Sequence, residues 1–356
     1  MKTGIQRIMI IVLGVILGIG VICVRTDALI KPGDAFPGMS FDLSSNKKAQ
    51  EYLGIRRGKT IELSQIDADL LIVEVMSVYC VSCMSQTAYD RELFTMIEGN
   101  NRTAGKVKMI GIGAGNNLRE VNKFVEEFDV PYPVFPDFEF SRYNQVGQVR
   151  TPFKIFMKKK PDGTFRVIET EQGAREDVKR TFGMIVAMLD GRYSPEGEVE
   201  AASMKLKEVD QDVVEQLLKE WLDRNGETLT VKELFEESGM TVYKIGSKEK
   251  QFAVLVNRVS TCDVCKEVQF LYIVDRLGNV RDIIPIHLSK LYNETFNEED
   301  VSKIKGNIIA RNVRETIPFN PAVDAVSSAT ITSGLMYDSI NKGALIYRRL
   351  IEKGFI

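Results

Sequence analysis

Two pairs of cysteines have the spacing in this sequence that most clearly points to chemistry. Cys80 and Cys83 form one C-x-x-C pair, and Cys262 and Cys265 form a second. Pairs at this spacing occur in thiol redox sites and in metal sites, and they can also close a structural disulfide. The two pairs are far apart along the chain, so each has to be interpreted from its own surroundings.

The first pair lies at a predicted junction between a strand and a helix. The apolar run 70–75 ends before Ser77, and a helical pattern begins at the cysteines. Unpaired N–H groups and the positive end of the helix dipole favour a thiolate there, so we expect the pKa of Cys80 to be lowered. Because a thiolate attacks disulfides, we predict a redox dithiol; a structural disulfide and half of a metal site are the alternatives.

The elements that must position this dithiol alternate between strands and helices. A mixed sheet flanked by helices, which is an α/β fold, follows from that order. The predicted strands after the cysteine helix span residues 106–112, 132–135, 150–159 and 165–169, and the predicted helices span residues 117–128, 138–146 and 174–189.

Residues 31–190 resemble the thioredoxin-like superfamily, in particular its membrane-anchored, extracytoplasmic thiol-disulfide oxidoreductases of the peroxiredoxin-like branch. The resemblance rests on GDAFPGMSF at 33–41, on CVSC at the strand-helix junction, on an extra strand-helix insertion, and on Thr151-Pro152. It implies that Pro152 is cis and lies against the dithiol, where it helps to bind the substrate disulfide. It also implies that Cys80 is the attacking thiolate and Cys83 the resolving thiol.

Two features of this part of the chain leave room for other interpretations. Tyr79 stands where most relatives have tryptophan, so an aromatic ring still covers the dithiol, but the partner and the redox potential are open. Pro152 could also be an ordinary proline of an edge strand.

An apolar segment at residues 8–24 precedes the thioredoxin-like part. Lys2 and Arg7 lie before it and Arg25 closes it. Its length is at the short end for a transmembrane helix and long for the core of a signal peptide. We predict an uncleaved single-pass anchor in the cell membrane, with a removed secretory signal as the alternative. The positive residues before the segment place the bulk of the chain outside the cytoplasm, where an oxidising setting suits a cycling dithiol.

The second half is predicted to be an α+β domain with a helical lead-in. The four predicted parts of the chain are the anchor or signal at 1–29, the thioredoxin-like domain at 30–190, a polar linker at 191–204 and the second domain at 205–356. Within the last part we predict one helix at 205–222, a second that starts at Thr230 with a TVKE capping box, a third at 297–305 and a fourth at the end of the chain. The predicted strands span residues 251–259, 267–274 and 280–286.

DAVSSATITS at 324–333 is the most specific motif in the chain. It resembles the motif of FMN-binding domains in sodium-pumping and ion-translocating electron-transport complexes and in stand-alone flavoproteins. In those domains a flavin transferase attaches FMN to the threonine hydroxyl through a phosphoester. The resemblance implies that Thr330 is the attachment site. It also implies that the recognition residues are Asp324, Ser327, Ser328 and Ala329.

The flavin motif departs from its family at one position and has a purely structural alternative. Glycine is commoner at the position of Ser328, so flavin transfer could be slower or absent. A helix start suits the phosphate of FMN, because its N–H groups and dipole favour an anion. The same serines and threonine could simply cap the last helix.

Cys262 and Cys265 lie between two predicted strands. A zinc site would need four ligands, and only His287, the one histidine of the chain, and carboxylates could complete it. We therefore predict no metal. A second redox dithiol near the flavin is our preferred hypothesis, with a disulfide that staples the hairpin as the alternative.

Together these features predict a membrane-tethered redox protein outside the cytoplasm. Electrons would pass between FMN on Thr330, the Cys262/Cys265 dithiol and the Cys80/Cys83 dithiol, which would act on client protein disulfides. One alternative is an FMN electron carrier that serves a membrane electron donor, with the thioredoxin-like half as a docking or independent module. Another is a thiol oxidoreductase whose second half carries no flavin. The balance of 47 basic against 49 acidic residues suggests no nucleic-acid partner.

Overall fold

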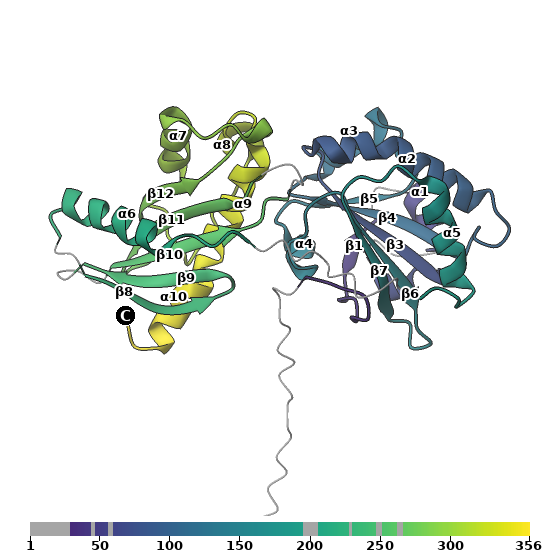
Figure 1. Ribbon diagram of the computed structural model, residues 1–356, viewed down its shortest axis with the longest axis horizontal. Helices are drawn as coiled ribbons and strands as arrows, with labels where there is room; N and C mark the ends of the chain where they lie inside the picture. Colours follow the sequence, from purple (N-terminus) through teal and green to yellow (C-terminus); the bar gives the residue numbers. More distant parts are fainter. Residues whose placement is uncertain are drawn as a thin grey trace, which may run out of the picture.

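The computed structural model describes residues 29–43, 47–55, 60–194, 206–227, 230–246, 251–261 and 266–356. Figure 1 shows two lobes, each built around a five-stranded sheet. We call residues 29–194 the first lobe and residues 206–356 the second lobe. The predicted membrane segment at 8–24 lies outside the described residues. In the described part of the chain, no helix is both long enough and apolar enough to cross a membrane.

The first lobe holds a mixed sheet in the strand order β5-β4-β3-β6-β7. The central β3 (Leu70–Met76) pairs in parallel with β4 and antiparallel with β6. All seven residues of β3 are buried, because helices cover one face of the sheet and the rest of the lobe covers the other. With a C-x-x-C directly after β3, this is the predicted thioredoxin-like fold. The remaining strands are β4 (Val107–Ala114), β5 (Val134–Asp137), β6 (Phe153–Lys159) and β7 (Phe165–Gln172).

Alternate residues of β3 enter two apolar layers. Leu70 and Ile72 pack with α2 (Val81–Glu98) and α5 (Val178–Leu189) on one face of the sheet. The opposite face of β3 belongs to a cluster that includes Phe41 of the small two-stranded sheet. The other elements of this lobe are β1 (Ser40–Asp42), α1 (Lys47–Tyr52), β2 (Thr60–Glu62), η1 (Leu63–Gln65), α3 (Leu118–Glu127) and α4 (Ser141–Gln145).

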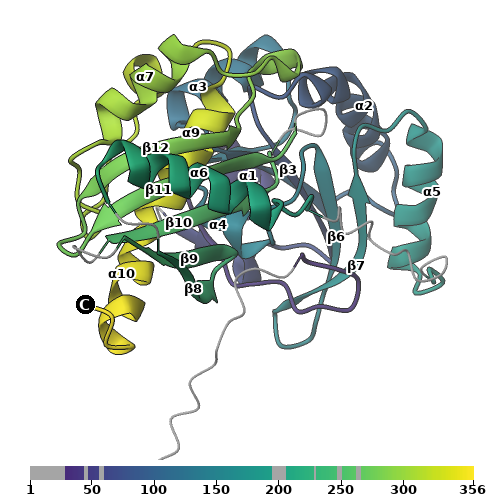
Figure 2. The same cartoon turned by 60° about the vertical axis from the view of Figure 1, so that its left-hand side comes forward.

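The second lobe is an antiparallel sheet in the order β12-β11-β10-β9-β8, covered on both faces. Along β10, Ala253 and Leu255 pack under α6, while Phe252 and Val254 share a cluster with α9 and α10. Figure 2 shows α6 in front of the sheet and the two C-terminal helices behind it. The strands are β8 (Val231–Glu237), β9 (Met240–Ile245), β10 (Gln251–Arg258), β11 (Val268–Asp275) and β12 (Val280–His287), and the helices are α6 (Gln211–Arg224), η2 (Leu291–Asn293), α7 (Glu298–Ile308), α8 (Pro321–Asp324), α9 (Thr330–Asn341) and α10 (Gly343–Glu352).

The helix predicted from Thr230 is wrong, because this segment forms strand β8. β8 and β9 are joined by the two residues Ser238 and Gly239, whose φ angles are 53° and 70°. Two consecutive left-handed residues make the type of turn that fits the twist of a β-hairpin. Pairing with β9 therefore overrides the local capping signal.

The C-terminal helix is also divided where a single helix was predicted. α9 ends before Lys342, and α10 begins at Gly343. A Cβ atom on Gly343 would lie 2.9 Å from the Cβ of Val313, so a residue without a side chain is required at this close approach. In these two helices, Met336, Ile340 and Tyr347 are buried and Ile351 is exposed.

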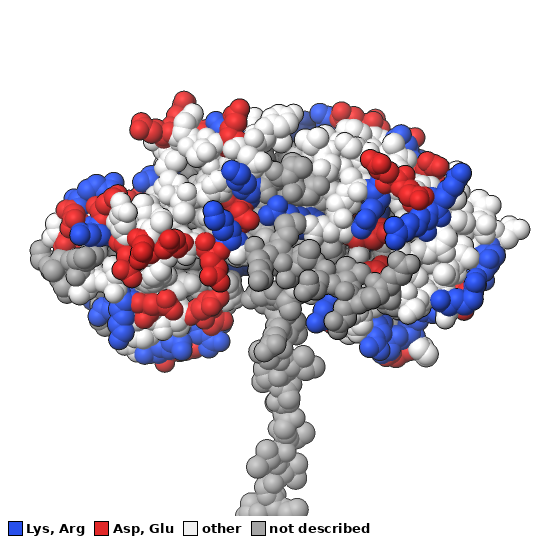
Figure 3. All heavy atoms as spheres, viewed as in Figure 1, with Lys and Arg blue, Asp and Glu red and all other residues white. Residues whose placement is uncertain are grey.

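The two lobes share one apolar cluster and a polar contact. The cluster contains Phe140 of the first lobe together with Leu335 and Met336 of the second. Beside it, the Arg258 guanidinium contacts Asp338 at 2.6 Å, and the Asn144 side-chain amide donates to the same carboxylate at 3.2 Å. The lobes are therefore packed together. Figure 3 shows acidic and basic side chains intermingled on the surface of both.

Candidate functional site

The Cys80/Cys83 dithiol lies at the start of α2, as the sequence predicts. Cys80 is the N-cap residue, and its sulfur accepts a hydrogen bond from the backbone N–H of Cys83 at 3.4 Å. The two side chains are 0% and 3% exposed. The dithiol is therefore covered in the folded chain, although its position at a helix start is that of a reactive one.

Pro152 lies beside the dithiol and follows a cis peptide bond with Thr151. The Cys80 thiol donates to the carbonyl oxygen of Thr151 at 3.5 Å. Pro152 is buried, and it precedes β6, which lies between β3 and β7 inside the sheet. The alternative of an edge-strand proline does not apply. The structure brings Cys80, Cys83 and the Thr151-Pro152 peptide together.

A buried group of charges lies near Cys83. The Lys154 ammonium contacts Asp90 at 2.9 Å and Glu74 at 3.1 Å, and the hydroxyl of Tyr132 donates to Glu74. Two carboxylates therefore share one cation in a buried place, which disfavours the ionised form of Asp90. Burial, together with Glu74, raises the pKa of Asp90 to about 7. The group can hold or release one proton near neutral pH.

The same environment keeps Cys83 protonated. Burial raises the pKa of the Cys83 thiol well above its ordinary value, and the neighbouring Cys80 and the charge of Glu74 raise it further. A thiol that stays neutral suits the predicted resolving role, because it does not compete with Cys80 as a nucleophile.

Tyr79 connects the dithiol to the second lobe. Its hydroxyl donates to Glu120 at 2.7 Å, which fixes the ring at the start of α2. Tyr79 also lines a cavity of about 110 Å³, and most of the other lining residues come from the predicted flavin motif and from the loop after β12. These residues are Ser289, Lys290, Leu291, Ser328, Ala329, Thr330, Ile331 and Thr332.

Thr330 is the first residue of α9, and its surroundings are fixed by neighbouring hydrogen bonds. Ser328 has a left-handed φ of 58°, and its carbonyl accepts from the N–H of Leu291 at 2.7 Å. The Thr332 hydroxyl donates to the carbonyl of Ser289 at 2.7 Å. The N-cap of α9 is Ala329, with no side-chain capping bond. The alternative that the serines and Thr330 cap this helix is therefore not what the structure shows.

The start of α9 also contacts the dithiol. Ile331, which directly follows Thr330, packs against the apolar cluster of Met76, Cys80, Cys83 and Phe124. The residue after the predicted attachment residue therefore contacts the dithiol cluster, although Cys80 and Thr330 lie 250 positions apart in the sequence.

Two of the predicted recognition residues lie outside the cavity lining. Asp324 ends α8, and its carboxylate accepts from the N–H of Asn320 at 2.7 Å. Ser327 is exposed to solvent. Ser328 and Ala329 line the cavity with Thr330.

Cys262 and Cys265 fall outside the described residues, but the residues on either side of them are described. The carbonyl of Thr261 accepts two hydrogen bonds from Thr151, from its N–H at 2.5 Å and from its hydroxyl at 2.7 Å. On the other side, the N–H of Lys266 donates to the Asn293 side chain at 2.9 Å. The chain thus enters the CDVC segment at a residue bonded to Thr151, whose own carbonyl accepts from the Cys80 thiol.

His287 is the last residue of β12. Burial, with the positive charge of Lys266, lowers its pKa. Within the described residues, no group of three histidine, cysteine or carboxylate side chains is arranged to hold a metal ion. The alternative of a zinc site involves Cys262 and Cys265 and lies outside that description.

The residues around Thr330 fit one end of the FMN that the motif implies. The N-terminus of the 12-residue α9 offers backbone N–H groups to a phosphate, and no side chain caps them. Lys290 is another lining residue, and its ammonium is paired with Asp300 at 3.0 Å. The volume of about 110 Å³ is below the roughly 300–1,000 Å³ of pockets that enclose a whole ligand. The cavity therefore fits the phosphate end of FMN and not the complete cofactor.

No protein-family model matches the chain, and no curated protein matches its sequence. Its structure is similar to a candidate thiol:disulfide interchange protein DsbE from Chlorobium tepidum, at 14% identity over 46% of this chain and 99% of that chain, with a TM-score of 0.35. It is similar to the thioredoxin domain of a thiol-disulfide oxidoreductase from Bacteroides vulgatus, at 15% identity over 45% and 99%, with a TM-score of 0.34. A third similar structure is Mycobacterium tuberculosis AhpC, at 14% identity over 47% and 98%, with a TM-score of 0.35. The first lobe has a thioredoxin-like fold by its own strand order and by the position of the dithiol at the start of α2.

Several site residues were not singled out from the sequence. Glu74 and Lys154 each interrupt an apolar strand, and a charge at a buried strand position was the signal that could have identified them. Thr261 and Ile331 carry no such signal, because their place at the dithiol depends on how the lobes pack.

Proposed function

We propose that this chain is a flavin-dependent thiol-disulfide oxidoreductase that carries FMN covalently on Thr330 and passes electrons between that cofactor and the Cys80/Cys83 dithiol. The observation that supports this most directly is the shared cavity. One wall is Tyr79, which precedes Cys80, and another is Thr330, while Ile331 contacts the dithiol cluster itself. The thioredoxin-like fold and the buried dithiol supply the thiol half of this proposal.

Different residues of the chain would bind the FMN phosphate and position the dithiol. The amides at the start of α9 and the Lys290 ammonium would hold the phosphate of FMN. Bound there, the flavin supplies a two-electron donor or acceptor beside the dithiol. Pro152 and Thr151 hold Cys80 in place, and the Glu74–Lys154–Asp90 group stores a proton close to Cys83.

The thiol step that we propose links the two C-x-x-C pairs. A thiolate of the Cys262/Cys265 pair attacks the Cys80–Cys83 disulfide, and a mixed disulfide forms. The second thiol of the attacking pair then attacks the sulfur of its own partner in the mixed disulfide. The Cys262–Cys265 disulfide forms, and Cys80 and Cys83 are released as thiols. What supports this route is that Thr261, the residue before Cys262, is held at Thr151 by two hydrogen bonds.

We propose the compartment and the partners on the sequence alone. The apolar segment 8–24, flanked by Lys2, Arg7 and Arg25, supports a membrane tether with the lobes outside the cytoplasm. A flavin transferase would then mature the protein, and client protein disulfides or a membrane electron donor would exchange electrons with it.

Flavin attachment is tested first by coexpression with a flavin transferase. We expect the denatured wild-type chain to give a fluorescent band in a gel, and Thr330→Ala to give none, because the phosphoester needs the hydroxyl. Ser302→Ala changes an exposed residue of α7 outside both the motif and the cavity lining, so this matched control should keep a fluorescent band. A wild-type chain without fluorescence, or a fluorescent Thr330→Ala variant, rejects Thr330 as the attachment site.

Electron transfer is tested on the flavinylated chain. We expect reduction of the flavin under anaerobic conditions to convert the Cys80–Cys83 disulfide to thiols, which mass spectrometry after alkylation detects. If all four C-x-x-C cysteines stay oxidised beside a reduced flavin, the internal route is wrong. If Cys262→Ser with Cys265→Ser leaves the reduction of Cys80 and Cys83 unchanged, the second pair is not part of it.

A further inference from the structure

The Cys80 sulfur is inaccessible although thiol exchange requires a partner sulfur to reach it. Cys80 is 0% exposed. On the side of the second lobe, Thr261 is hydrogen-bonded to the residue that contacts the Cys80 thiol, and Ile331 packs against the dithiol cluster. A disulfide in another protein cannot reach Cys80 while the chain keeps this arrangement.

The contact at Thr151 is a backbone contact of a kind that any extended polypeptide can make. The N–H and the hydroxyl of Thr151 both donate to the single carbonyl oxygen of Thr261, at 2.5 and 2.7 Å. Both threonines are fully buried, at 0% exposure. A carbonyl oxygen is present in every residue, so this recognition does not depend on the side chain that follows. A client polypeptide that docked at Thr151 would use the same N–H and hydroxyl donors.

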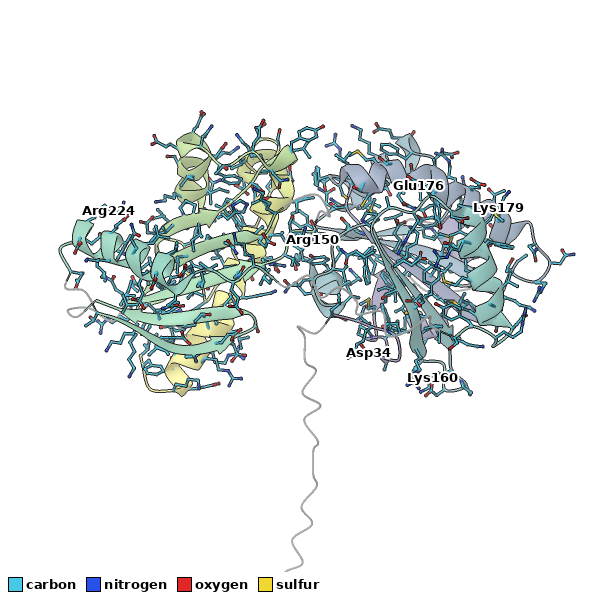
Figure 4. All side chains as sticks on the ribbon, viewed as in Figure 1. Asp34, Arg150, Lys160, Glu176, Lys179 and Arg224 are labelled. Atoms are coloured by element: carbon cyan, nitrogen blue, oxygen red, sulfur yellow. The ribbon has the colours of Figure 1, made fainter. Side chains whose placement is uncertain are left out.

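An ion pair flanks this contact and ties the two lobes together. Arg150 precedes Thr151 and contacts the carboxylate of Glu267 at 3.5 Å. The two side chains are 11% and 21% exposed, so the pair is partly shielded from water. Figure 4 shows Arg150 where the two lobes meet. This pair can be broken and rebuilt by mutation without changing the cysteines or the flavin motif.

We propose that Thr261 occupies the place of a client polypeptide, so that the docked second lobe blocks the Cys80/Cys83 dithiol from the disulfides of other proteins. Access to an outside disulfide then requires that the lobes separate at the Thr151–Thr261 contact. The dithiol is thereby reserved for exchange within the chain until the lobes open. This inference rests on the proposed function only in taking Cys80 and Cys83 as the reactive dithiol.

The experiment measures how fast Cys80 is modified in the reduced, flavin-free full chain. A maleimide attached to a polyethylene glycol chain is the bulky probe, iodoacetamide is the small one, and mass spectrometry follows the peptide that contains Cys80. When opening is fast, the rate follows the population of the open form. Arg150→Glu places two carboxylates against each other, and we expect it to raise the rate with the bulky probe by about tenfold.

The matched variants make the result specific to the contact. Arg150→Glu combined with Glu267→Arg rebuilds the pair with exchanged charges and should return the rate to that of the wild type. Arg102→Gln removes an exposed arginine that pairs with Asp190 in the first lobe, and it should leave the rate unchanged. If Arg150→Glu does not fold, Glu267→Gln provides the same comparison with the charge alone removed, and we expect a smaller rise in the same direction.

Two results would overturn the inference. One is a wild-type Cys80 that reacts with the bulky probe as fast as it does in the variants with a broken pair. The other is a double charge exchange that stays as fast as Arg150→Glu. Because no flavin is present, a failure here is separate from a failure of flavin attachment at Thr330.

Discussion

Ser328 has a left-handed backbone at the position where the sequence departs from the motif that it resembles. Its φ of 58° lies in the region that costs a residue with a side chain roughly 1–2 kcal/mol and costs glycine nothing. Glycine is the commoner residue of the motif at this position, and the conformation found here is the one that glycine adopts easily. Ser328 therefore keeps the backbone shape that glycine would allow.

Replacing Ser328 with glycine should not weaken the fold. The relief of about 1–2 kcal/mol is partly offset by the about 0.4–1 kcal/mol of extra entropy that glycine gives the unfolded chain. We expect the free energy of unfolding, measured in urea, to stay level or to rise by up to about 1.6 kcal/mol. Ser327→Gly is the matched control. It has no positive φ to relieve, so it should lose about 0.4–1 kcal/mol, and an equal loss in both variants would contradict the argument.

Asp90 should make the stability of the first lobe depend on pH. Its folded pKa is raised by burial to about 7 from an ordinary value of 3.8. Between these values the folded chain holds a proton that the unfolded chain has released, so the free energy of unfolding falls as the pH rises through this window. Asp90→Asn leaves one carboxylate for one ammonium, and it should flatten that fall.

The measurement is urea unfolding at several pH values between 5 and 8. Glu92→Gln removes an exposed carboxylate from the same helix and should leave the slope with pH as in the wild type. A wild-type stability that rises over this window, or a slope that survives in Asp90→Asn, would show that Asp90 is not the group responsible.

At the scale of elements, the start of α9 is held by bonds to its own lobe. The hydroxyl oxygen of Ser333 accepts from the N–H of Val326 at 3.0 Å, and the loop after β12 is bonded to Ser328 and Thr332. These bonds place Thr330 on the cavity wall while leaving the helix uncapped. Backbone N–H groups that no side chain caps, at a helix start held in a fixed position, suit the binding of a phosphate.

Ser333→Ala should loosen this start without touching the cavity. It leaves the buried N–H of Val326 without its acceptor, and we expect a loss of about 1–3 kcal/mol in the free energy of unfolding. Hydrogen exchange at the N–H of Val326 should become faster, because this N–H no longer has an acceptor. The exposed Ser327→Ala is the control and should change stability by less than about 0.5 kcal/mol. Unchanged exchange at Val326 in Ser333→Ala would show that the bond does not hold the segment.

The ring of Phe140 lies between the two lobes and packs against both of them. A Cβ atom on Gly115 of the first lobe would lie 2.5 Å from this ring, and one on Gly334 of the second lobe would lie 3.3 Å from it. Two glycines thus allow the ring to contact both lobes at once. Because one apolar cluster runs through both lobes, we expect them to unfold together.

Phe140→Ala should uncouple the two lobes. Removing a buried phenylalanine costs about 3–5 kcal/mol, and here the cost falls on the interface between them. Trp221, the one tryptophan of the chain, lies on α6 of the second lobe and reports that lobe by its fluorescence, whereas far-ultraviolet circular dichroism reports both. The two urea curves should coincide in the wild type and separate in the variant. Separate curves in the wild type would contradict a single cooperative unit.

Local patterns in the sequence were enough for the parts of the fold that depend on neighbours along the chain. The strand at the apolar run 70–75, the helix that starts at the cysteines and the helix predicted at 117–128 each form where the sequence predicts them, because their signals lie within a few residues. The segment from Thr230 failed for the opposite reason. Its capping signal is local, but it became a strand through pairing with β9.

The composition of the site was decided by tertiary structure. Cys80 and Thr330 each carry a motif that the sequence alone reveals, but their proximity depends on the packing of two lobes through Phe140 and Gly334. Ile331 packs against the dithiol cluster and Thr261 bonds to Thr151, and neither contact has a sequence signal, since a backbone carbonyl and an aliphatic side chain are common everywhere. The sequence by itself therefore determined which groups can react. Only the packing of the lobes decided which of them meet and that the dithiol is closed to solvent.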